Sequence, residues 1–170
     1  MKQLLLVRHG KSDWDLPGLS DHDRVLNERG LRDAPRMAAA LERRGVKPDG
    51  IVTSSAVRAA TTASLVARHL SFPEDSIQQI PALYLASPGT ILRTVQGLDE
   101  SKEVVLIFGH NPGMHEAVNL LCEAPGLEDF PTLATAILEF DLDHWGEVDW
   151  GAGLLIEFLT PRSVAAEVAG

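Results

Sequence analysis

The sequence predicts a single α/β domain in which a mostly parallel, mixed sheet lies between two layers of helices. Two short apolar runs, residues 4–7 and 104–108, are typical of strands that are buried on both faces. Strand and helix patterns alternate along most of the chain, which favours parallel pairing. A length of 170 residues fits one domain with its own core. We therefore expect a three-layer α/β/α architecture with its ligand site at the carboxyl ends of the strands.

The first half of the chain adds two helices and a third strand to this sheet. Residues 27–44 have a helical pattern, in which Pro35 either kinks the helix or marks its first turn. Residues 50–53 form a weaker strand pattern. Residues 56–70 repeat small and apolar residues at helical spacing and end in basic residues, which suit a helix C-terminus. This part of the chain therefore predicts a strand, a turn and a helix in succession.

The second half completes both layers and closes the sheet. Residues 88–97 predict a short helix, and residues 112–122 predict another that directly follows the 104–108 strand. The pattern then changes to two apolar segments, residues 136–140 and 154–158, which predict a closing pair of strands.

We assign residues 1–160 to one domain and residues 161–170 to a C-terminal tail, because no repeat or linker interrupts the first segment.

Charge and composition exclude several classes of partner. A net charge of −9 argues against a nucleic-acid-binding or anionic membrane-binding protein, since both need a basic face. The one cysteine, Cys122, lies in an apolar stretch and is interpreted as a core residue, which fits a reducing cytoplasm. Arg8 interrupts the N-terminal apolar run, which leaves it too short for a signal peptide or a membrane span. We expect a cytoplasmic protein without a membrane anchor.

Histidines follow the two central strands at the point where each strand ends. The first strand runs into Arg8-His9-Gly10, and the other runs into Gly109-His110-Asn111. An imidazole beside a guanidinium and a glycine suits phosphoryl chemistry, because the arginine can hold phosphate oxygens. His110 also precedes a helix N-terminus, where free N–H groups favour an anion. Both strand ends are therefore expected to share one phosphate.

A third strand end adds a second arginine. The strand at residues 50–53 gives way to a hydroxyl-rich turn and then to a helix with Arg58 in its first turn. On so acidic a chain, one arginine at the start of a small-residue helix favours a phosphate clamp over a solvated surface position.

Four motifs in order resemble the histidine phosphatase superfamily, also called phosphoglycerate mutase-like, and within it the short SixA-type phosphohistidine phosphatases. The motifs cover residues 5–12, which include the Arg-His-Gly sequence, and residues 23–30, 54–63 and 109–113. An isolated Arg-His-Gly is a weak signal, so the order of the motifs and their strand context carry the resemblance.

The resemblance implies a role for each predicted site residue. His9 is the nucleophile, and its unprotonated ring nitrogen attacks phosphorus to form a phosphohistidine that water then hydrolyses. Arg8, Arg58 and a protonated His110 bind the phosphoryl oxygens, and Asn111 is placed with the phosphate-binding residues. Neither a metal nor a cofactor is implied.

The general acid is where the sequence departs from the family pattern. Larger members place a carboxylate after the third strand, but the corresponding residues 81–87 contain no Asp or Glu. Protonated phosphohistidine releases a neutral imidazole, so its cleavage tolerates a weak or absent acid, whereas an alkoxide leaving group does not. The missing acid favours a phosphorylated protein that carries phosphohistidine over a sugar phosphate, and also counts against a mutase.

The cluster Asp21-His22-Asp23 leaves several interpretations open. Two carboxylates that flank a histidine could ligate a metal, but carboxylates near a turn more often cap the backbone or pair with arginine. We expect a salt bridge from Asp23 to a neighbouring arginine and no metal site. An acid or structural role for Asp21 or Asp23 remains an alternative.

Two other functions use the same residues. One is a phosphatase of small phosphomonoesters, which leaving-group preference would distinguish. The other is a phosphopeptide-binding module without turnover, against which the nucleophile His9 argues. The sequence does not indicate the oligomeric state.

Overall fold

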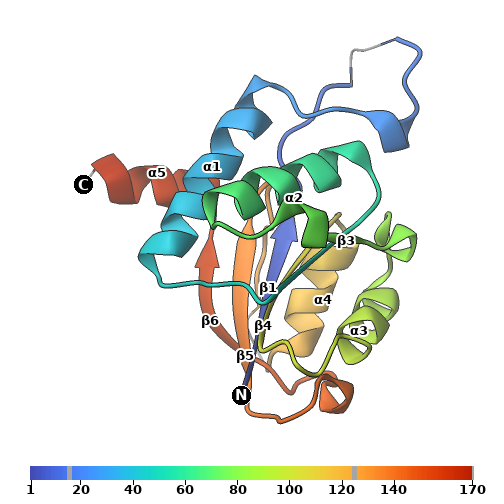
Figure 1. Cartoon of the computed structure of the whole chain (residues 1–170), viewed down its shortest axis with the longest axis vertical. Coiled ribbons are helices and arrows are strands. Elements are labelled where there is room, and N and C mark those ends of the chain that lie inside the picture. Colours follow the sequence, from blue (N-terminus) through green and yellow to red (C-terminus); the bar gives the residue numbers. More distant parts are fainter. Residues whose placement is uncertain (15–16, 124–125, 170) are drawn as a thin grey trace.

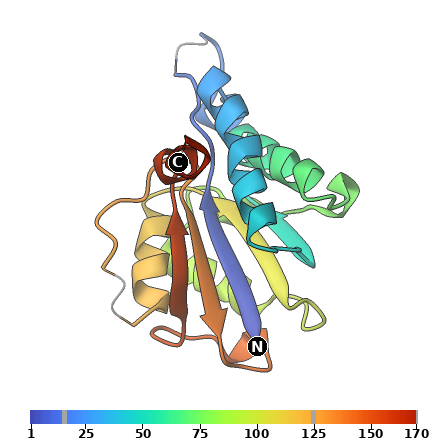
Figure 2. The same cartoon turned by 90° about the vertical axis from the view of Figure 1, so that its left-hand side faces the viewer.

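A single six-stranded sheet forms the centre of the molecule (Figures 1 and 2). The structure, a computed structural model, describes residues 1–14, 17–123 and 126–169. The strands lie in the order β3-β2-β4-β1-β5-β6. Their bounds are β1 Lys2–Arg8, β2 Gly50–Thr53, β3 Gln78–Gln79, β4 Val104–Gly109, β5 Thr135–Phe140 and β6 Leu154–Leu159. The first four strands pair in parallel, β5 is antiparallel to β1, and β6 is antiparallel to β5. The predicted mostly parallel, mixed sheet is confirmed.

Helices cover both faces of this sheet, as Figure 2 shows from the side. The helices are α1 Glu28–Arg43, α2 Val57–His69, α3 Pro88–Gln96, α4 Gly113–Leu121 and α5 Pro161–Ala169. Two separate clusters of buried side chains follow from this arrangement. One lies between the sheet and α1, α2 and α5, and the other between the sheet and α3 and α4. The predicted three-layer α/β/α fold is therefore confirmed.

The central strand β1 shows why its sequence is continuously apolar. Leu4 and Leu6 belong to the cluster beneath α3 and α4, whereas Leu5 and Val7 belong to the cluster beneath α1 and α2. Successive side chains of a strand point to opposite faces, and here both faces are covered.

Helix α1 begins where a side chain caps it and continues through its proline. The side chain of Asn27 accepts a hydrogen bond from the Gly30 N–H, which satisfies one free donor of the first turn. Pro35 lies inside the helix and does not mark its start, so of the two predicted possibilities the first-turn one is wrong.

Two elements were not predicted. β3 is only two residues long, Gln78–Gln79, which is too short to give a strand pattern. Residues 161–169, which the sequence assigns to a tail, form α5; Val164 enters the core and Arg44 binds Glu167 from the end of α1. Gly170, the last residue of that predicted tail, lies outside the described residues. Within the described segments, no helix is long and apolar enough to cross a membrane.

The sheet brings the ends of β1 and β4 together. These neighbouring parallel strands pair Arg8 with Gly109, so the residues that follow each strand emerge side by side. The start of α1 packs closely against the loop after β1, because a Cβ on Gly30 would overlap the carbonyl oxygen of Lys11. These contacts bring three of the sequence motifs, residues 5–12, 23–30 and 109–113, close together.

Candidate active site

A cavity of about 370 Å³ lies at the carboxyl ends of β1 and β4. Most of the predicted site residues line it: Arg8, His9, Asp21, Arg58, His110 and Asn111. Asp23 is not among the lining residues. The fold therefore brings together the three strand-end segments that the sequence singled out.

His9 directs its unprotonated Nε2 toward this cavity, where that nitrogen accepts a long hydrogen bond from Arg58. Its Nδ1 lies 2.7 Å from the carbonyl oxygen of Gly10, and a carbonyl can only accept, so Nδ1 carries the proton and Nε2 does not. Nε2 lies 3.4 Å from Nε of Arg58. Burial, with the charges of Arg58 and Arg8 nearby, lowers the pKa of His9 from 6.5 to about 3. At neutral pH the ring is uncharged and held in one tautomer.

Thr62 joins the loop after β1 to helix α2. The hydroxyl of Thr62 accepts a hydrogen bond from the Gly10 N–H at 3.0 Å and donates to the Arg58 carbonyl at 2.7 Å. Thr62 is fully buried, so this link is shielded from water. It fixes the position of the loop after β1 relative to α2, the helix that carries Arg58.

The two predicted arginines reach the cavity from different elements. Arg58, in the first turn of α2, is almost fully buried and donates through Nη1 to the backbone oxygen of Asp21 at 2.6 Å. Arg8 donates through Nη1 to the carbonyl of Phe130 at 3.1 Å, while its buried Nε has no partner within the described part of the chain. A buried donor without a partner is costly, and a phosphoryl oxygen would satisfy it.

His110 differs from the expectation that it is protonated. Its Nε2 lies 2.8 Å from the hydroxyl of Ser54, and its Nδ1 lies 3.5 Å from Nη2 of Arg58. Burial, and then the charge of Arg58, lowers the pKa of His110 from 6.5 to about 4. The ring is therefore neutral at pH 7 in the free site, because a cation there would be desolvated beside another cation.

The side chain of Asn111 binds the same loop as Arg8. Its Nδ2 donates to the carbonyl of Phe130 at 2.8 Å, and its Oδ1 is buried with no partner among the described residues. This bond holds the turn after β4 against the loop before β5. A direct contact of Asn111 with phosphate stays a prediction.

Asp21, rather than Asp23, pairs with the arginines, which corrects the sequence prediction. Its carboxylate accepts from Nη2 of Arg58 at 3.1 Å, from Nε of Arg24 at 3.0 Å and from the hydroxyl of Tyr84. The Tyr84 hydrogen bond and the two arginines lower its pKa to about 2. The carboxyl group is therefore ionised at neutral pH and has no proton to donate as a general acid.

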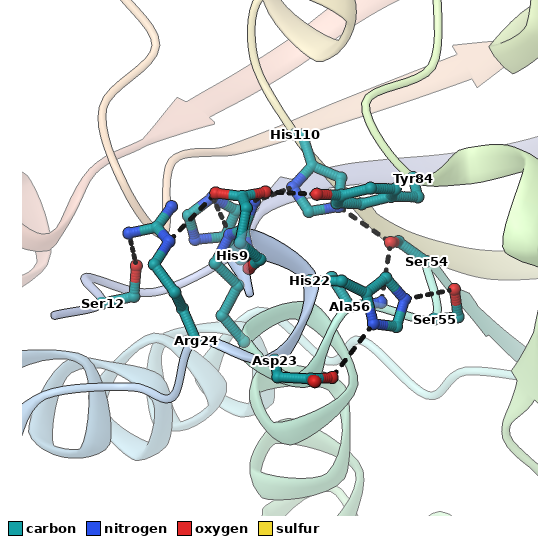
Figure 3. A network of polar contacts seen from close by, with 12 residues as sticks. His9, Ser12, His22, Asp23, Arg24, Ser54, Ser55, Ala56, Tyr84 and His110 are labelled. Atoms are coloured by element: carbon teal, nitrogen blue, oxygen red, sulfur yellow. Dashed lines mark hydrogen bonds and ion pairs between the residues drawn. The ribbon is translucent and has the colours of Figure 1, made fainter. Parts of the chain in front are cut away.

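The remaining members of the acidic cluster face away from His9 (Figure 3). His22 places Nε2 2.9 Å from the hydroxyl of Ser55 and Nδ1 3.4 Å from Oδ1 of Asp23. Asp23 thus contacts a histidine because the 3₁₀ turn at Asp21–Asp23 directs only Asp21 toward the arginines. Throughout residues 1–14, 17–123 and 126–169, no group of three or more His, Cys, Asp or Glu side chains is arranged to hold a metal ion.

Four residues with a direct part in this network had no predicted role. Thr62 binds Gly10. Ser54 binds His110, Arg24 binds the hydroxyl of Ser12 as well as Asp21, and the rings of Tyr84 and His110 pack edge to face (Figure 3). Ser54 lies in the hydroxyl-rich turn that the sequence did show. Tyr84 lies within residues 81–87, which lack the carboxylate that the family pattern places there.

Comparison with protein families gives one matching model. Residues 4–84 match the model of the histidine phosphatase superfamily (branch 1). This segment includes the loop after β1, Asp21, Arg58 and Tyr84.

Similar proteins cover nearly the whole chain. The crystal structure of the putative phosphohistidine phosphatase SixA from Agrobacterium tumefaciens is 30% identical, with a TM-score of 0.80 over 94% of this chain and 98% of that one. The protein histidine phosphatase SixA complexed with tungstate is 26% identical, with a TM-score of 0.82 over 95% and 99% of the two chains. An uncharacterized protein of Mycobacterium tuberculosis is 30% identical over 92% of this chain and 100% of its own length.

Proposed function

Because this chain belongs to the histidine phosphatase superfamily, we propose that it is a phosphohydrolase that transfers a phosphoryl group to His9 and then to water. The observation that carries this proposal is the fixed tautomer of His9. The Gly10 carbonyl holds the proton on Nδ1 and leaves the lone pair of Nε2 inside a cavity lined by arginines.

In the first step, Nε2 of His9 forms a bond to phosphorus while the bond from phosphorus to the leaving group breaks. The leaving-group atom takes the bonding pair, and for a phosphorylated imidazole it departs as a neutral ring because its other nitrogen is protonated. Arg8 and Arg58 meet the negative charge on the equatorial oxygens. His110 contributes once a bound phosphoryl group has raised its pKa.

In the second step, a water oxygen attacks the phosphorus of the phosphorylated His9. The bond to Nε2 breaks and its electron pair returns to the imidazole, which keeps its proton on Nδ1. Inorganic phosphate leaves with the oxygen and both protons of the water, and then exchanges protons with solvent. The same cationic groups stabilise both steps, so we propose that the reaction needs no metal.

We propose phosphohistidine on a protein as the substrate class. The support is chemical: residues 81–87 contain no carboxylate, and Asp21 is ionised at neutral pH, so an alkoxide leaving group would find no carboxylic acid to protonate it in either place. Two structural relatives carry phosphohistidine or protein histidine phosphatase in their names. Tungstate, which one of them binds, is a tetrahedral oxyanion like phosphate.

The test is phosphate release from a phosphohistidine-bearing carrier protein, in excess chelator, compared with an alkyl phosphate at equal concentration. We expect release from the carrier protein, little turnover of the alkyl phosphate, and a covalent phosphate on the protein after rapid quenching. His9→Ala should release no phosphate and carry no covalent phosphate, whereas His69→Ala, which changes an exposed histidine at the end of α2, should behave as the wild type.

Each alternative predicts a different result. Equal turnover of the alkyl phosphate would indicate a phosphatase of small phosphomonoesters. Binding without release would indicate a phosphopeptide-binding module. Activity that is lost in chelator, or retained in His9→Ala, would contradict the mechanism itself.

A further inference from the structure

Two exposed apolar side chains stand at the mouth of a cavity that is otherwise polar. Trp14 is 74% exposed and Leu85 is 56% exposed, and both line the cavity around His9. Every other residue that lines it is polar or charged. The two come from separate segments, the loop after β1 and the turn before α3, so the fold places them together.

The backbone at Leu85 is strained. Its φ angle is 49°, in the left-handed region, which a branched side chain rarely adopts and which glycine adopts without cost. Such strain, where it occurs, is concentrated at functional sites. A leucine in this conformation, exposed at the edge of a polar cavity, gains little from burial, so its side chain has no evident part in folding.

One face of the Trp14 ring stacks on the guanidinium of Arg24. Cζ of Arg24 lies 3.5 Å from the centroid of the Trp14 ring, which is a stacked cation–π contact. Arg24 is itself held by Ser12 at 2.9 Å and Asp21 at 3.0 Å. With one face on a fixed guanidinium and most of the side chain exposed, the indole offers its other face to a ligand.

We propose that Trp14 and Leu85 form a leaving-group subsite that binds the imidazole ring of the phosphohistidine being cleaved. This inference rests on the proposed function and specifies what that site recognises beyond phosphate. The arginines and histidines account for the phosphoryl group, and a cavity of about 370 Å³ has room for more than that group alone. A flat ring with apolar faces suits an indole face and a leucine, whereas an ammonia or a short alkyl leaving group would leave both unused.

The test compares two substrates with the same phosphorus–nitrogen bond, a phosphohistidine peptide and phosphoramidate, which has no ring. The measured quantity is the kcat/KM for the phosphohistidine peptide divided by the kcat/KM for phosphoramidate. We expect Trp14→Ala and Leu85→Gly each to lower this ratio about tenfold, the amount that one aromatic contact typically contributes. Trp14→Phe, which keeps an aromatic face, should restore most of it.

Two controls separate this role from folding and from phosphate binding. Leu85→Gly removes the strain at that residue and should leave the melting temperature equal or higher. Trp150→Ala, at a tryptophan 39% exposed outside the cavity, should leave the ratio unchanged. If Trp14 acted only by holding Arg24 in place, Trp14→Ala would slow the cleavage of both substrates equally and leave the ratio unchanged.

The outcomes are distinguishable. A ratio that stays within twofold of the wild type in both variants would overturn the subsite, as would an equal loss on the two substrates. If the wild type cleaves neither compound, the proposed function fails, independently of Trp14 and Leu85. A phenyl phosphate arm tests the ring itself: turnover equal to that of the phosphohistidine peptide would overturn the assignment to imidazole.

Discussion

The ends of β1 and β4 carry the same residue type in different surroundings. His9 and His110 follow neighbouring parallel strands, both are buried, and their ring centroids lie 5.2 Å apart. Nδ1 of His9 and Nε2 of His110 have different kinds of partner. His9 faces a backbone carbonyl, which only accepts, whereas His110 faces the hydroxyl of Ser54, which can donate or accept.

This difference bears on the roles that we propose for the two rings. The carbonyl fixes the tautomer of His9, so its lone pair stays on Nε2. The hydroxyl of Ser54 can donate or accept, so it is compatible with either protonation state of His110. We therefore propose His9 as the nucleophile and His110 as the group that stabilises charge.

The largest expected effect comes from replacing each histidine in turn. His9→Ala should lose turnover and form no covalent phosphate, because no other nitrogen takes its place. His110→Asn should still form the intermediate but turn over about 10²–10³ times more slowly, as one charge-stabilising donor is lost. Single-turnover kinetics with detection of acid-labile phosphate on the protein measures both. An intermediate that forms in His9→Ala would reverse the two assignments.

A smaller effect concerns stability in mild acid. The pKa values of His9 and His110 are lowered from 6.5 to about 3 and about 4, so between pH 6.5 and 5 the unfolded chain takes up protons that the folded chain does not. The free energy of unfolding should fall by about 3 kcal/mol over that interval as pH decreases. Urea denaturation at several pH values measures it.

The histidine variants supply the control for this pH dependence. His9→Ala and His110→Asn should each flatten the curve between pH 6.5 and 5 by roughly half. The lowered pKa of Asp21, about 2, affects stability only at more acidic pH, where its carboxylate becomes protonated. A curve that keeps its full slope in both variants would contradict neutral, buried rings in the folded protein.

The smallest effect tests the hydroxyl that distinguishes the two histidines. Ser54→Ala removes the partner of His110 Nε2 at 2.8 Å and leaves the Gly10 contact of His9 intact. We expect a loss of about fivefold to tenfold in kcat, as for one hydrogen bond, with normal formation of the covalent intermediate. Ser55→Ala, at the neighbouring hydroxyl that binds His22, is the matched control and should change kcat little. A larger loss in Ser55→Ala would place His22, rather than His110, in the mechanism.

Much of the site could be predicted because its chemistry lies next to strong local patterns. His9 and His110 directly follow the two most apolar strands, and Arg58 begins a helix of small residues. The choice between Asp21 and Asp23 could not be predicted. Both lie in one short turn, and only its docking against α2 decides which carboxylate meets Arg58.

The sequence by itself determined five of the six strands, most of the helices and the mixed sheet, and it singled out His9 as the proposed nucleophile, because these depend on periodicity and on residues adjacent to strand ends. Tertiary structure alone decided the tautomer of His9, the neutral state of His110, the hydrogen bonds that gather at ionised Asp21 and the placement of Trp14 and Leu85 along one cavity. Those properties depend on burial and on partners far apart in the chain, and a linear pattern carries no information about either.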